Sequence, residues 1–324
     1  MEIINQQVFF KIIHDFDIVP YTQSKGMCEM YSIAGREKIH FFSNDVETPT
    51  MACFGHEKVF FTKKMILIEG ECFRKKSDIN STSIKSFYAD ILQLGYDFVE
   101  VCSNAPYNFN YETGLRQAGY LRPVGQFSMP ITKIIDLTSE IKYNQNWKRN
   151  IKKSQSNNLK FEVINEITKL DSDDFISIYK EMSERKSMTL SLNSHQVLTL
   201  CKSSNFRLFF VSHDNIRLAA ILIQNSNSHA GLLYAATTKN ALTVLASFFM
   251  YSELFEYLKS TGCKTFDMEK LVPSTDAVNS VFLFKNGVEG THVQLNGEWS
   301  WYRKSYYRPL MYFVKKYLMK KREL

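Results

Sequence analysis

Two acidic residues near the end of a predicted strand have a spacing that suits proton transfer. Asp267 and Glu269 stand two positions apart in the segment Lys264–Glu269, which has the composition of a strand. Alternate side chains of a strand point to one face, so both carboxylates are expected on the same face. At the carboxyl end of a strand such a face can open into a cleft, where a carboxylate can take a proton from a substrate. The alternative is an acidic residue that caps the next loop.

A second group of charged residues is basic. Lys148 and Arg149, with Lys152 and Lys153, lie beside Trp147 in a polar segment, 141–158, that is predicted to be helical. Four cations on one helix can contact RNA or another phosphate-bearing ligand. A solvated helix face is the alternative.

Cysteine and histidine patterns indicate neither a metal centre nor a nucleophilic triad. The six cysteines contain no Cys-x-x-Cys pair, and the seven histidines are scattered. The start, Met1–Ile13, carries Glu2 and no basic n-region, so we do not expect a secretory signal. The longest apolar runs, of about six residues as in Leu218–Ile223, are far shorter than the roughly 20 that span a bilayer. We therefore expect a cytoplasmic protein with reduced thiols.

The excess positive charge sits at one end of the chain. Lys and Arg number 40 against 33 Asp and Glu, a net charge of +7. Residues 303–324 hold eight bases and one acid, so the rest of the chain is neutral. A helix is predicted from Pro309, with Leu310, Phe313, Val314, Tyr317 and Leu318 on one face and Lys315, Lys316, Lys320 and Arg322 mostly opposite. Such a helix suits an anionic membrane surface, RNA, or simple docking on the protein.

Alternating strand and helix signals run through the whole chain. In the first half, strands are expected at Lys38–Phe42, Lys58–Thr62, Met65–Glu71, Phe98–Cys102 and Gln126–Leu137, and helices at Ser83–Leu94 and Tyr111–Ala118. In the second half, strands are expected at Lys160–Ile164, Phe206–Ser212, Arg217–Gln224, Ala230–Thr237 and Lys264–Met268, with a final pair at His292–Leu295 and Trp299–Tyr302. Helices are expected there at Ser172–Lys186, Ala241–Ser260 and Asp276–Lys285. The sequence therefore predicts a domain at 1–137, a second at 138–302, and the basic amphipathic helix at 303–324.

This order, together with several short strings, resembles a known family. The strings are Pro20–Ser24, Gly114–Tyr120, Ile134–Leu137, Trp147–Ser154, Phe266–Met268 and Phe284–Gly287. In this order and spacing they resemble the FemAB/FemX family of peptidoglycan-bridge or BioF2-like acyltransferases, within the GNAT superfamily. The resemblance implies an α/β fold of tandem GNAT-like (acyl-CoA N-acyltransferase) domains, with mixed central sheets flanked by helices.

The resemblance also implies an activity, the transfer of an acyl or aminoacyl group onto an amine. The donor would be an aminoacyl-tRNA or an acyl-CoA, with no tightly bound cofactor. The acceptor would be a glycan or peptidoglycan precursor of the cell envelope, met at the inner face of the membrane. Two alternatives are an acetyl-CoA-dependent N-acetyltransferase of an amino sugar in surface-polysaccharide synthesis, and a non-catalytic GNAT-like binding module.

Further site residues follow from the resemblance. Lys285, in the family's recurrent Phe-Lys pair, would stabilise the oxyanion or hold the donor's phosphates, with a solvated helix-end lysine as the alternative. Arg185 would bind substrate, Tyr234 lies near the central strand, and Lys148 and Arg149 would contact substrate as well. In GNAT folds two central strands splay apart, and here these would be Ala230–Thr237 and Lys264–Glu269.

One departure bears on the donor. Ordinary GNAT enzymes hold the pyrophosphate of coenzyme A on a glycine-rich turn at a helix N-terminus. The corresponding segment, Thr237–Ser247, contains no glycine, so close backbone approach to a pyrophosphate is harder. This departure is compatible with an aminoacyl-tRNA donor.

Overall fold

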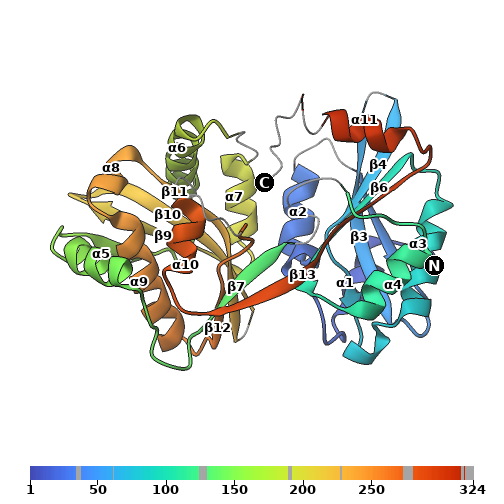
Figure 1. The fold of residues 1–324 in the computed structure, drawn as a ribbon, viewed down its shortest axis with the longest axis horizontal. Coiled ribbons are helices and arrows are strands. Elements are labelled where there is room, and N and C mark those ends of the chain that lie inside the picture. The colour runs from blue at the N-terminus through green and yellow to red at the C-terminus, as the bar shows by residue number, and fades with distance from the viewer. Residues whose placement is uncertain are drawn as a thin grey trace. The chain divides into compact units, whose positions relative to one another are not determined.

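The computed structural model describes residues 1–33, 38–60, 62–123, 130–188, 192–226, 228–272, 280–314 and 317. The chain forms two units, which we call unit 1 and unit 2 (Figure 1). Unit 1 consists of Met1–Ile131 and Val293–Leu324, and unit 2 of Thr132–His292. Each unit is a mixed β-sheet flanked by helices.

The sheet of unit 1 contains one parallel pair. Its strands, in order across the sheet, are β1 (Glu2–Ile4), β2 (Lys38–Ser43), β3 (Met51–Phe60), β4 (Lys63–Ile68), β6 (Phe98–Pro106) and β13 (Thr291–Tyr302), with β5 (Cys72–Phe73) on β3. β4 and β6 run parallel, with Met65 opposite Phe98 and Ile68 opposite Val101. The other described pairs of this unit are antiparallel.

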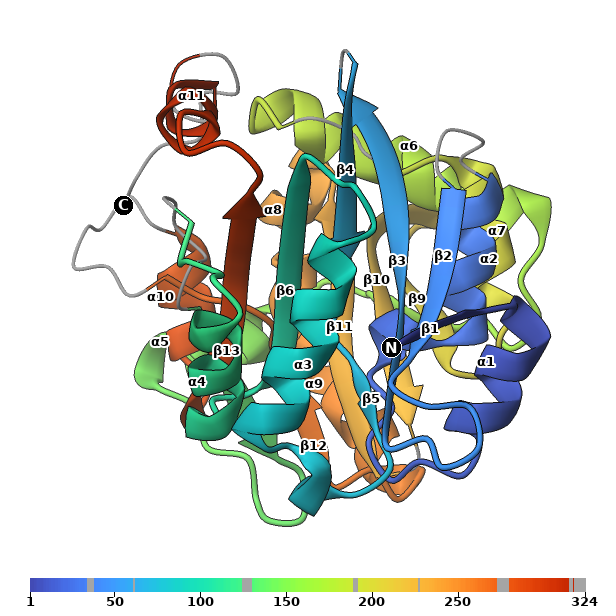
Figure 2. The ribbon, with the colours of Figure 1, turned by 90° about the vertical axis from the view of Figure 1, so that its right-hand side faces the viewer.

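Helices pack on both faces of this sheet. On one face lie α3 (Ser81–Leu92) and α4 (Phe109–Gln117), as Figure 2 shows. The α3 side chains Ile84, Phe87, Tyr88 and Ile91 recur at helical spacing and are buried against β4 and β6. On the other face lie α1 (Gln6–Ile13) and α2 (Lys25–Ile33), where Phe9 packs against Phe41 and Phe54 at 5.3 and 5.8 Å between ring centroids.

The sheet of unit 2 also has one parallel pair. Its strands, in order, are β7 (Ile131–Asp136), β12 (Thr265–Asp267), β11 (His229–Thr237), β10 (Ile216–Ser226), β9 (Phe206–His213) and β8 (Lys160–Val163). β11 and β12 are parallel, and the other described pairs are antiparallel.

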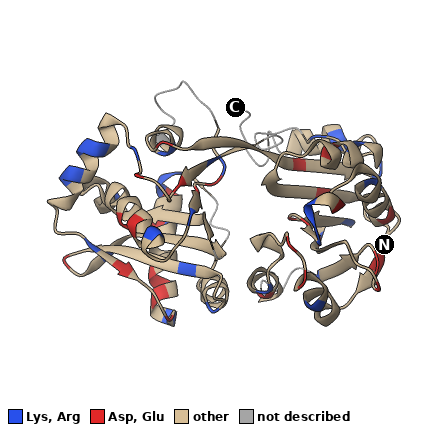
Figure 3. Cartoon of the chain, turned by 90° about the horizontal axis from the view of Figure 1, so that it is seen from below, with Lys and Arg blue, Asp and Glu red and all other residues tan. Residues whose placement is uncertain are grey.

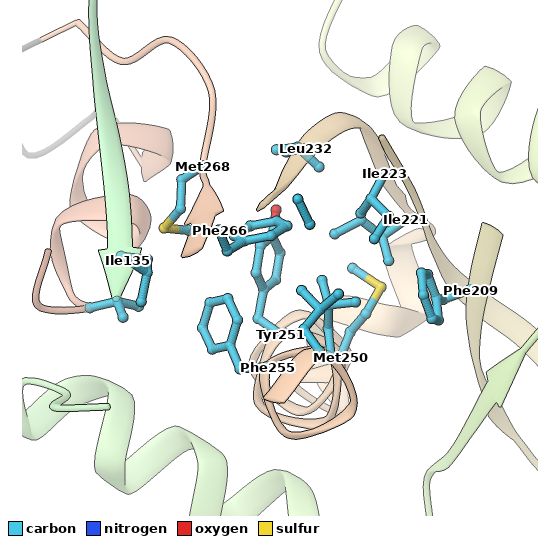
Figure 4. Packing of buried hydrophobic residues seen from close by; sticks show 14 of the residues in the cluster. Ile135, Phe209, Ile221, Ile223, Leu232, Met250, Tyr251, Phe255, Phe266 and Met268 are labelled. Atoms are coloured by element: carbon cyan, nitrogen blue, oxygen red, sulfur yellow. The ribbon is translucent and has the colours of Figure 1, made fainter. Parts of the chain in front are cut away.

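The core of unit 2 lies between this sheet and α9 (Ala246–Ser260). Figure 4 shows Met250, Tyr251 and Phe255 of α9 beside Phe266 of β12 and Ile221 of β10. α5 (Gln145–Gln155) packs on α9, while α6 (Lys169–Arg185) and α7 (Ser194–Cys201) cover the opposite face. Because both faces are covered, the middle segments of β9 and β10, Leu208–Val211 and Leu218–Ile223, are continuous runs of buried apolar residues.

Several expected elements differ in detail. The expected helix Ala241–Ser260 is two helices, α8 (Lys239–Thr243) and α9, because Leu245 adopts a left-handed conformation with φ of 58°. The expected final strand pair is the single strand β13, in which the register shifts between Leu295 and Gly297. The helix expected at Asp276–Lys285 is described only as α10 (Ser280–Asn286), since residues 273–279 lie outside the described residues.

The two units divide the chain differently from the expected boundaries at 137 and 302. β7 lies before residue 137 in sequence, yet it pairs with β12 and belongs to unit 2. Residues 293–302, expected in the second domain, pair with β6 in unit 1. The terminal helix α11 (Tyr307–Phe313) also belongs to unit 1. Each sheet is thus completed by a strand that follows, in sequence, a helix of the other unit.

Candidate active site

The central strands of unit 2 pair only over a short distance. β11 and β12 are paired at His229–Thr265, Ala230–Phe266 and Gly231–Asp267, and their described pairing ends there. β11 continues to Thr237, whereas the strand β12 ends at Asp267. The described pairing of the two strands thus ends after three residue pairs, where the resemblance implied a splay, and chemistry-bearing residues follow directly at the end of β12.

Asp267 is tied into the backbone at this point. Its Oδ1 accepts hydrogen bonds from the Thr132 hydroxyl and, at 2.7 Å, from the amide of Glu269. The second bond joins residues i and i+2, the Asx pattern that starts a turn. Burial raises the pKa of Asp267, and these two hydrogen bonds offset part of that rise. Asp267 thus fixes how the chain leaves the strand.

Glu269 is placed by that turn rather than by strand alternation. Its φ is 63°, a conformation in which few residues other than glycine are found. The expectation that Asp267 and Glu269 alternate along one strand is therefore wrong, because β12 ends at Asp267. Burial and the nearby charge of Asp267 raise the pKa of Glu269. A carboxyl group with a raised pKa suits a proton acceptor near neutral pH.

Lys285 lies against the same turn. Its Nζ donates hydrogen bonds to the backbone carbonyls of Glu269 (3.2 Å) and Lys270 (2.9 Å), and only 8% of the residue is exposed. Burial lowers the pKa of Lys285, and the charges of Glu269 and Asp267 oppose that effect. The structure therefore brings Lys285, Asp267 and Glu269 together, and the expectation of a solvated helix-end lysine does not describe Lys285.

A tryptophan and a glycine hold the helix that carries Lys285. Trp147 of α5 is buried, and its indole N–H donates to the carbonyl of Phe284 at 2.9 Å. A Cβ at Gly287, directly after α10, would lie 2.1 Å from the Trp147 ring. Only glycine lets the indole pack this closely. The Phe284–Gly287 string therefore has a structural reason, because it docks α10 on α5.

Two residues of this cluster were not predicted. Thr132 and Lys133 lie on β7 and are 1% and 3% exposed. The Lys133 Nζ lies 3.3 Å from the side-chain oxygen of Asn286, at the end of α10, and its carbonyl accepts from the Met268 amide. Burial lowers the pKa of Lys133. The sequence does show a polar pair, Thr132 and Lys133, between the apolar residues Ile131 and Ile134. Such a pair is also what an exposed edge strand would show, so the pattern alone does not indicate a buried site.

Arg185 and Tyr234 lie elsewhere, on α6 and β11 respectively. Arg185, at the end of α6, donates through Nη2 to the carbonyl of Thr237 at 2.8 Å, where β11 ends. Tyr234 packs edge-on against Tyr179 of α6, with ring centroids 5.8 Å apart. No described contact joins either residue to the Lys285 cluster. Both residues instead help to pack α6 against β11.

The basic residues of α5 face solvent. Lys148 and Arg149 are exposed, and Arg149 donates to Asn146 on its own helix. Figure 3 shows the basic bands along this helix, at the left of the view. The buried Trp147 anchors α5 to the core of unit 2, so the helix that carries these exposed cations is held in place.

The segment that corresponds to the pyrophosphate-binding turn of ordinary GNAT enzymes makes hydrogen bonds within itself. The Thr238 side chain caps α8 by accepting from the amide of Ala241. The amide of Val244, directly after α8, bonds to the carbonyl of Asn240. These amides are thus already used within the segment.

The described residues contain neither a metal-binding cluster nor a helix that could cross a membrane. No group of three or more His, Cys, Asp or Glu side chains there is placed to hold a metal ion. Within the same residues, every helix is too short or too polar to cross a bilayer.

Both units have the same architecture, a mixed sheet with one parallel pair and helices on both faces, which is a tandem GNAT-like fold. No protein-family model matches the sequence, and no curated protein is significantly similar to it. Solved structures do match. FemX has a TM-score of 0.72 and 12% identity, over 96% of this chain and 100% of its own. L-PGS from Bacillus licheniformis has a TM-score of 0.65 and 13% identity, over 99% of both chains.

A tandem GNAT protein from the clavulanic acid biosynthesis pathway is also similar, with a TM-score of 0.51 and 8% identity over 82% of this chain and 83% of its own. The chain therefore has the FemX-like tandem GNAT fold that the sequence motifs predicted.

Proposed function

We propose that this protein is an N-acyltransferase whose active site lies in unit 2, at the point where the described pairing of β11 and β12 ends. The observation that carries the proposal is the cluster of Lys285, Asp267 and Glu269, buried around the turn that follows β12. The FemX-like fold supports it, because the similar solved structures include a named tandem GNAT protein.

The reaction requires a base and a group that stabilises developing negative charge. The acceptor amine attacks the donor's carbonyl carbon and forms an amide bond, while the donor's ester or thioester bond breaks. Glu269, with its raised pKa, takes the amine's proton, which then passes to the leaving oxygen or sulfur. Lys285 stabilises the oxyanion or the donor's phosphates. Asp267 orients the turn that carries Glu269.

For the donor we favour an aminoacyl-tRNA over an acyl-CoA. The segment 237–247 lacks glycine and uses the amides of Ala241 and Val244 internally, which leaves a pyrophosphate fewer backbone donors. The exposed Lys148 and Arg149 supply cations of the kind that contact an RNA backbone.

For the acceptor we favour an amine on a glycan or peptidoglycan precursor of the cell envelope. Precursors of this kind carry phosphates when linked to a nucleotide or lipid, and the Arg185 guanidinium suits phosphate. Nη2 of Arg185 already donates to the Thr237 carbonyl. The other N–H groups of this guanidinium are the ones that we propose bind the phosphate. Tyr234 supports the helix that carries Arg185, through its contact with Tyr179.

Donor binding by calorimetry tests the proposal. Bulk tRNA is titrated into the wild-type protein and into Lys148→Gln/Arg149→Gln, with Lys202→Gln/Lys264→Gln as a control that removes two exposed cations elsewhere in unit 2. We expect salt-dependent tRNA binding that the first variant weakens and the control does not. Micromolar binding of acetyl-CoA would instead favour an N-acetyltransferase of an amino sugar. Binding of neither donor would favour a non-catalytic module.

A further inference from the structure

The terminal helix α11 has two apolar faces, and only one of them packs on unit 1. Tyr307 is buried and lies 4.8 Å from the ring of Phe98, and Met311 and Val314 share its face at helical spacing. The expectation of a single apolar face is therefore incomplete. A second apolar set follows at spacings of four, three and four residues, and its members are 49–60% exposed: Tyr306, Leu310, Phe313 and Tyr317.

A hairpin of the same unit displays a further apolar residue at the same end. Val59, near the tip of the β3–β4 hairpin, is 64% exposed. Lys63 of this hairpin lies 5.9 Å from the centre of the Tyr307 ring and 4.0 Å from Asp97. Figures 1 and 2 both place α11 and the hairpin tip at one end of unit 1. The contact of Lys63 with Tyr307 thus ties the hairpin to α11 at this end of unit 1.

Basic residues belong to the same elements of unit 1. Six cations belong to the two elements and the segment before α11: Lys58, Lys63, Lys64, Arg303, Lys304 and Arg308. The nearby carboxylate of Asp97 is already engaged, by Lys63 and by the backbone amide of Lys64. The net charge of this end is therefore strongly positive, in a chain whose other residues nearly balance.

We propose that this end of unit 1, defined by α11 and the β3–β4 hairpin tip, binds the surface of a bilayer that contains anionic lipids. Aromatic and aliphatic side chains among lysines and arginines are the composition that partitions into a lipid interface. Charge argues against a second copy of the chain as occupant, because pairing would bring two sets of cations together. Leu310 and Val59 argue against RNA, because aliphatic side chains offer no stacking surface for bases.

The inference goes beyond the proposed function and does not depend on it. It concerns unit 1, whereas the proposed acyl-transfer site lies in unit 2. Vesicle binding needs neither donor nor acceptor, so its failure would leave the acyl-transfer proposal standing, and the reverse also holds.

Flotation with vesicles tests the surface directly. The full-length protein is mixed with phosphatidylcholine vesicles, with or without about one third phosphatidylglycerol. We expect flotation with the anionic vesicles only. Leu310→Ser/Phe313→Ser should weaken partitioning about tenfold or more, because two interfacial anchors are lost. Lys304→Gln/Arg308→Gln should weaken it about 25-fold, since each cation near an anionic surface contributes roughly 1 kcal/mol, or about fivefold.

The matched apolar control is Leu170→Ser/Ile216→Ser in unit 2, where the residues are 68% and 65% exposed. It should float like the wild type. All these side chains are largely exposed, and a thermal melt verifies that each variant is folded. The proposal fails if the wild type ignores anionic vesicles, or if the apolar variant floats unchanged. It also fails if light scattering shows a wild-type dimer that Leu310→Ser/Phe313→Ser converts to a monomer.

Discussion

At the scale of single residues, burial shifts the pKa values of Lys285 and Glu269 in opposite directions, down for the lysine and up for the glutamate. A buried lysine usually has a partner carboxylate, but the Lys285 Nζ instead donates to two backbone carbonyls. Two backbone carbonyls thus hold the ammonium at the turn, with the charges of Glu269 and Asp267 nearby. In the proposed reaction, this cation stabilises the negative charge that develops on the donor.

Replacing Lys285 tests this role. We expect Lys285→Met to reduce turnover by about 100-fold or more, the scale of a lost oxyanion-stabilising donor. Two opposing effects limit the change in stability: two carbonyls lose a donor, and a buried charge is removed. Lys259→Met, on α9 beside Glu256, is the control and should retain activity. Wild-type turnover by Lys285→Met in a folded protein would refute the assignment.

The raised pKa of Glu269 predicts the acid side of the pH profile. Below that pKa the carboxyl is protonated and cannot accept the amine's proton, so kcat/KM should rise with pH through a value above the usual 4.5. Glu269→Gln should remove this limb and leave a low, flatter rate. Profiles of wild type and variant, measured with one donor, make the comparison. A limb that survives in Glu269→Gln would assign the base to another group.

Two glutamates of unit 1 predict opposite pH effects on stability. Burial raises the pKa of Glu71 to about 7, although the Tyr88 and Tyr111 hydroxyls donate to it. Burial would also raise the pKa of Glu69, but the neighbouring His56 ring, 3.5 Å away, and the Tyr31 hydroxyl that donates to Glu69 outweigh it and hold the pKa below its usual value. One carboxyl therefore opposes folding when it ionises, and the other favours it.

The sign of each effect follows from proton linkage. Between pH 4.5 and about 7 the folded state holds a proton on Glu71 that the unfolded state lacks, so stability falls as pH rises, by about 3 kcal/mol at roughly 1.4 kcal/mol per pKa unit. Glu71→Gln should thus be more stable than wild type at pH 8 and similar at pH 4.5. Glu69→Gln should lose stability at pH 8, with a smaller loss in acid. Thermal melts at the two pH values measure both, and parallel shifts for the two variants would contradict the assignment.

At the scale of elements, α10 is positioned by what it rests on. Trp147 lies beneath Phe284 and Gly287, and Lys133 reaches Asn286 at the helix end. These contacts come from α5 and β7, which are distant in sequence from α10. The placement of Lys285 therefore depends on two other elements.

Gly287→Ala tests that dependence. The added Cβ would lie 2.1 Å from the Trp147 ring, which is buried and cannot move freely, so α10 must shift. We expect a loss of about 1 to 3 kcal/mol in stability, as for other overpacked sites, and a fall in turnover that exceeds the loss of folded protein. Gly114→Ala is the matched control in unit 1, where a Cβ would lie 2.6 Å from Ile84. It should lower stability with the turnover of the folded fraction unchanged; equal effects on turnover would contradict the prediction.

The elements also show what the sequence could predict. Strong periodicity placed α3 and α6 within a few residues, and the end of the described pairing between β11 and β12 agrees with the splay that the resemblance implied. The left-handed residues Leu245 and Glu269 could not be predicted, because neither is a glycine and each conformation is imposed by its neighbours. Lys133 was missed for a similar reason, since its partner Asn286 is 153 positions away.

At the scale of the whole molecule, the chain exchanges strands between its units. β7 follows α4 of unit 1 in sequence and completes the sheet of unit 2, while β13 follows α10 and completes that of unit 1. A boundary read from sequence order alone therefore cuts each sheet. The residues of β7 could not indicate which sheet the strand joins, because a strand in either sheet would have the same apolar pattern.

Matched fragments test the exchange. Residues 132–292 form all of unit 2 and should unfold cooperatively as an isolated fragment. Residues 138–292 differ only by the loss of 132–137, which carry the buried side chains Ile135 and Leu137 and the Thr132 hydroxyl bonded to Asp267. At roughly 2 kcal/mol for each apolar side chain, plus lost hydrogen bonds, the deficit is about 5 kcal/mol.

That deficit predicts a fall in melting temperature of about 10 to 20 °C for a fragment of this size, or no cooperative transition at all. Calorimetry of the two fragments measures it. Adding a synthetic peptide that spans 130–140 should restore part of the stability of 138–292, because an antiparallel strand can re-form on β12. Equal melting of the two fragments would mean that β7 contributes little to unit 2, and Asp267 would then have to be held by the turn at Glu269 alone.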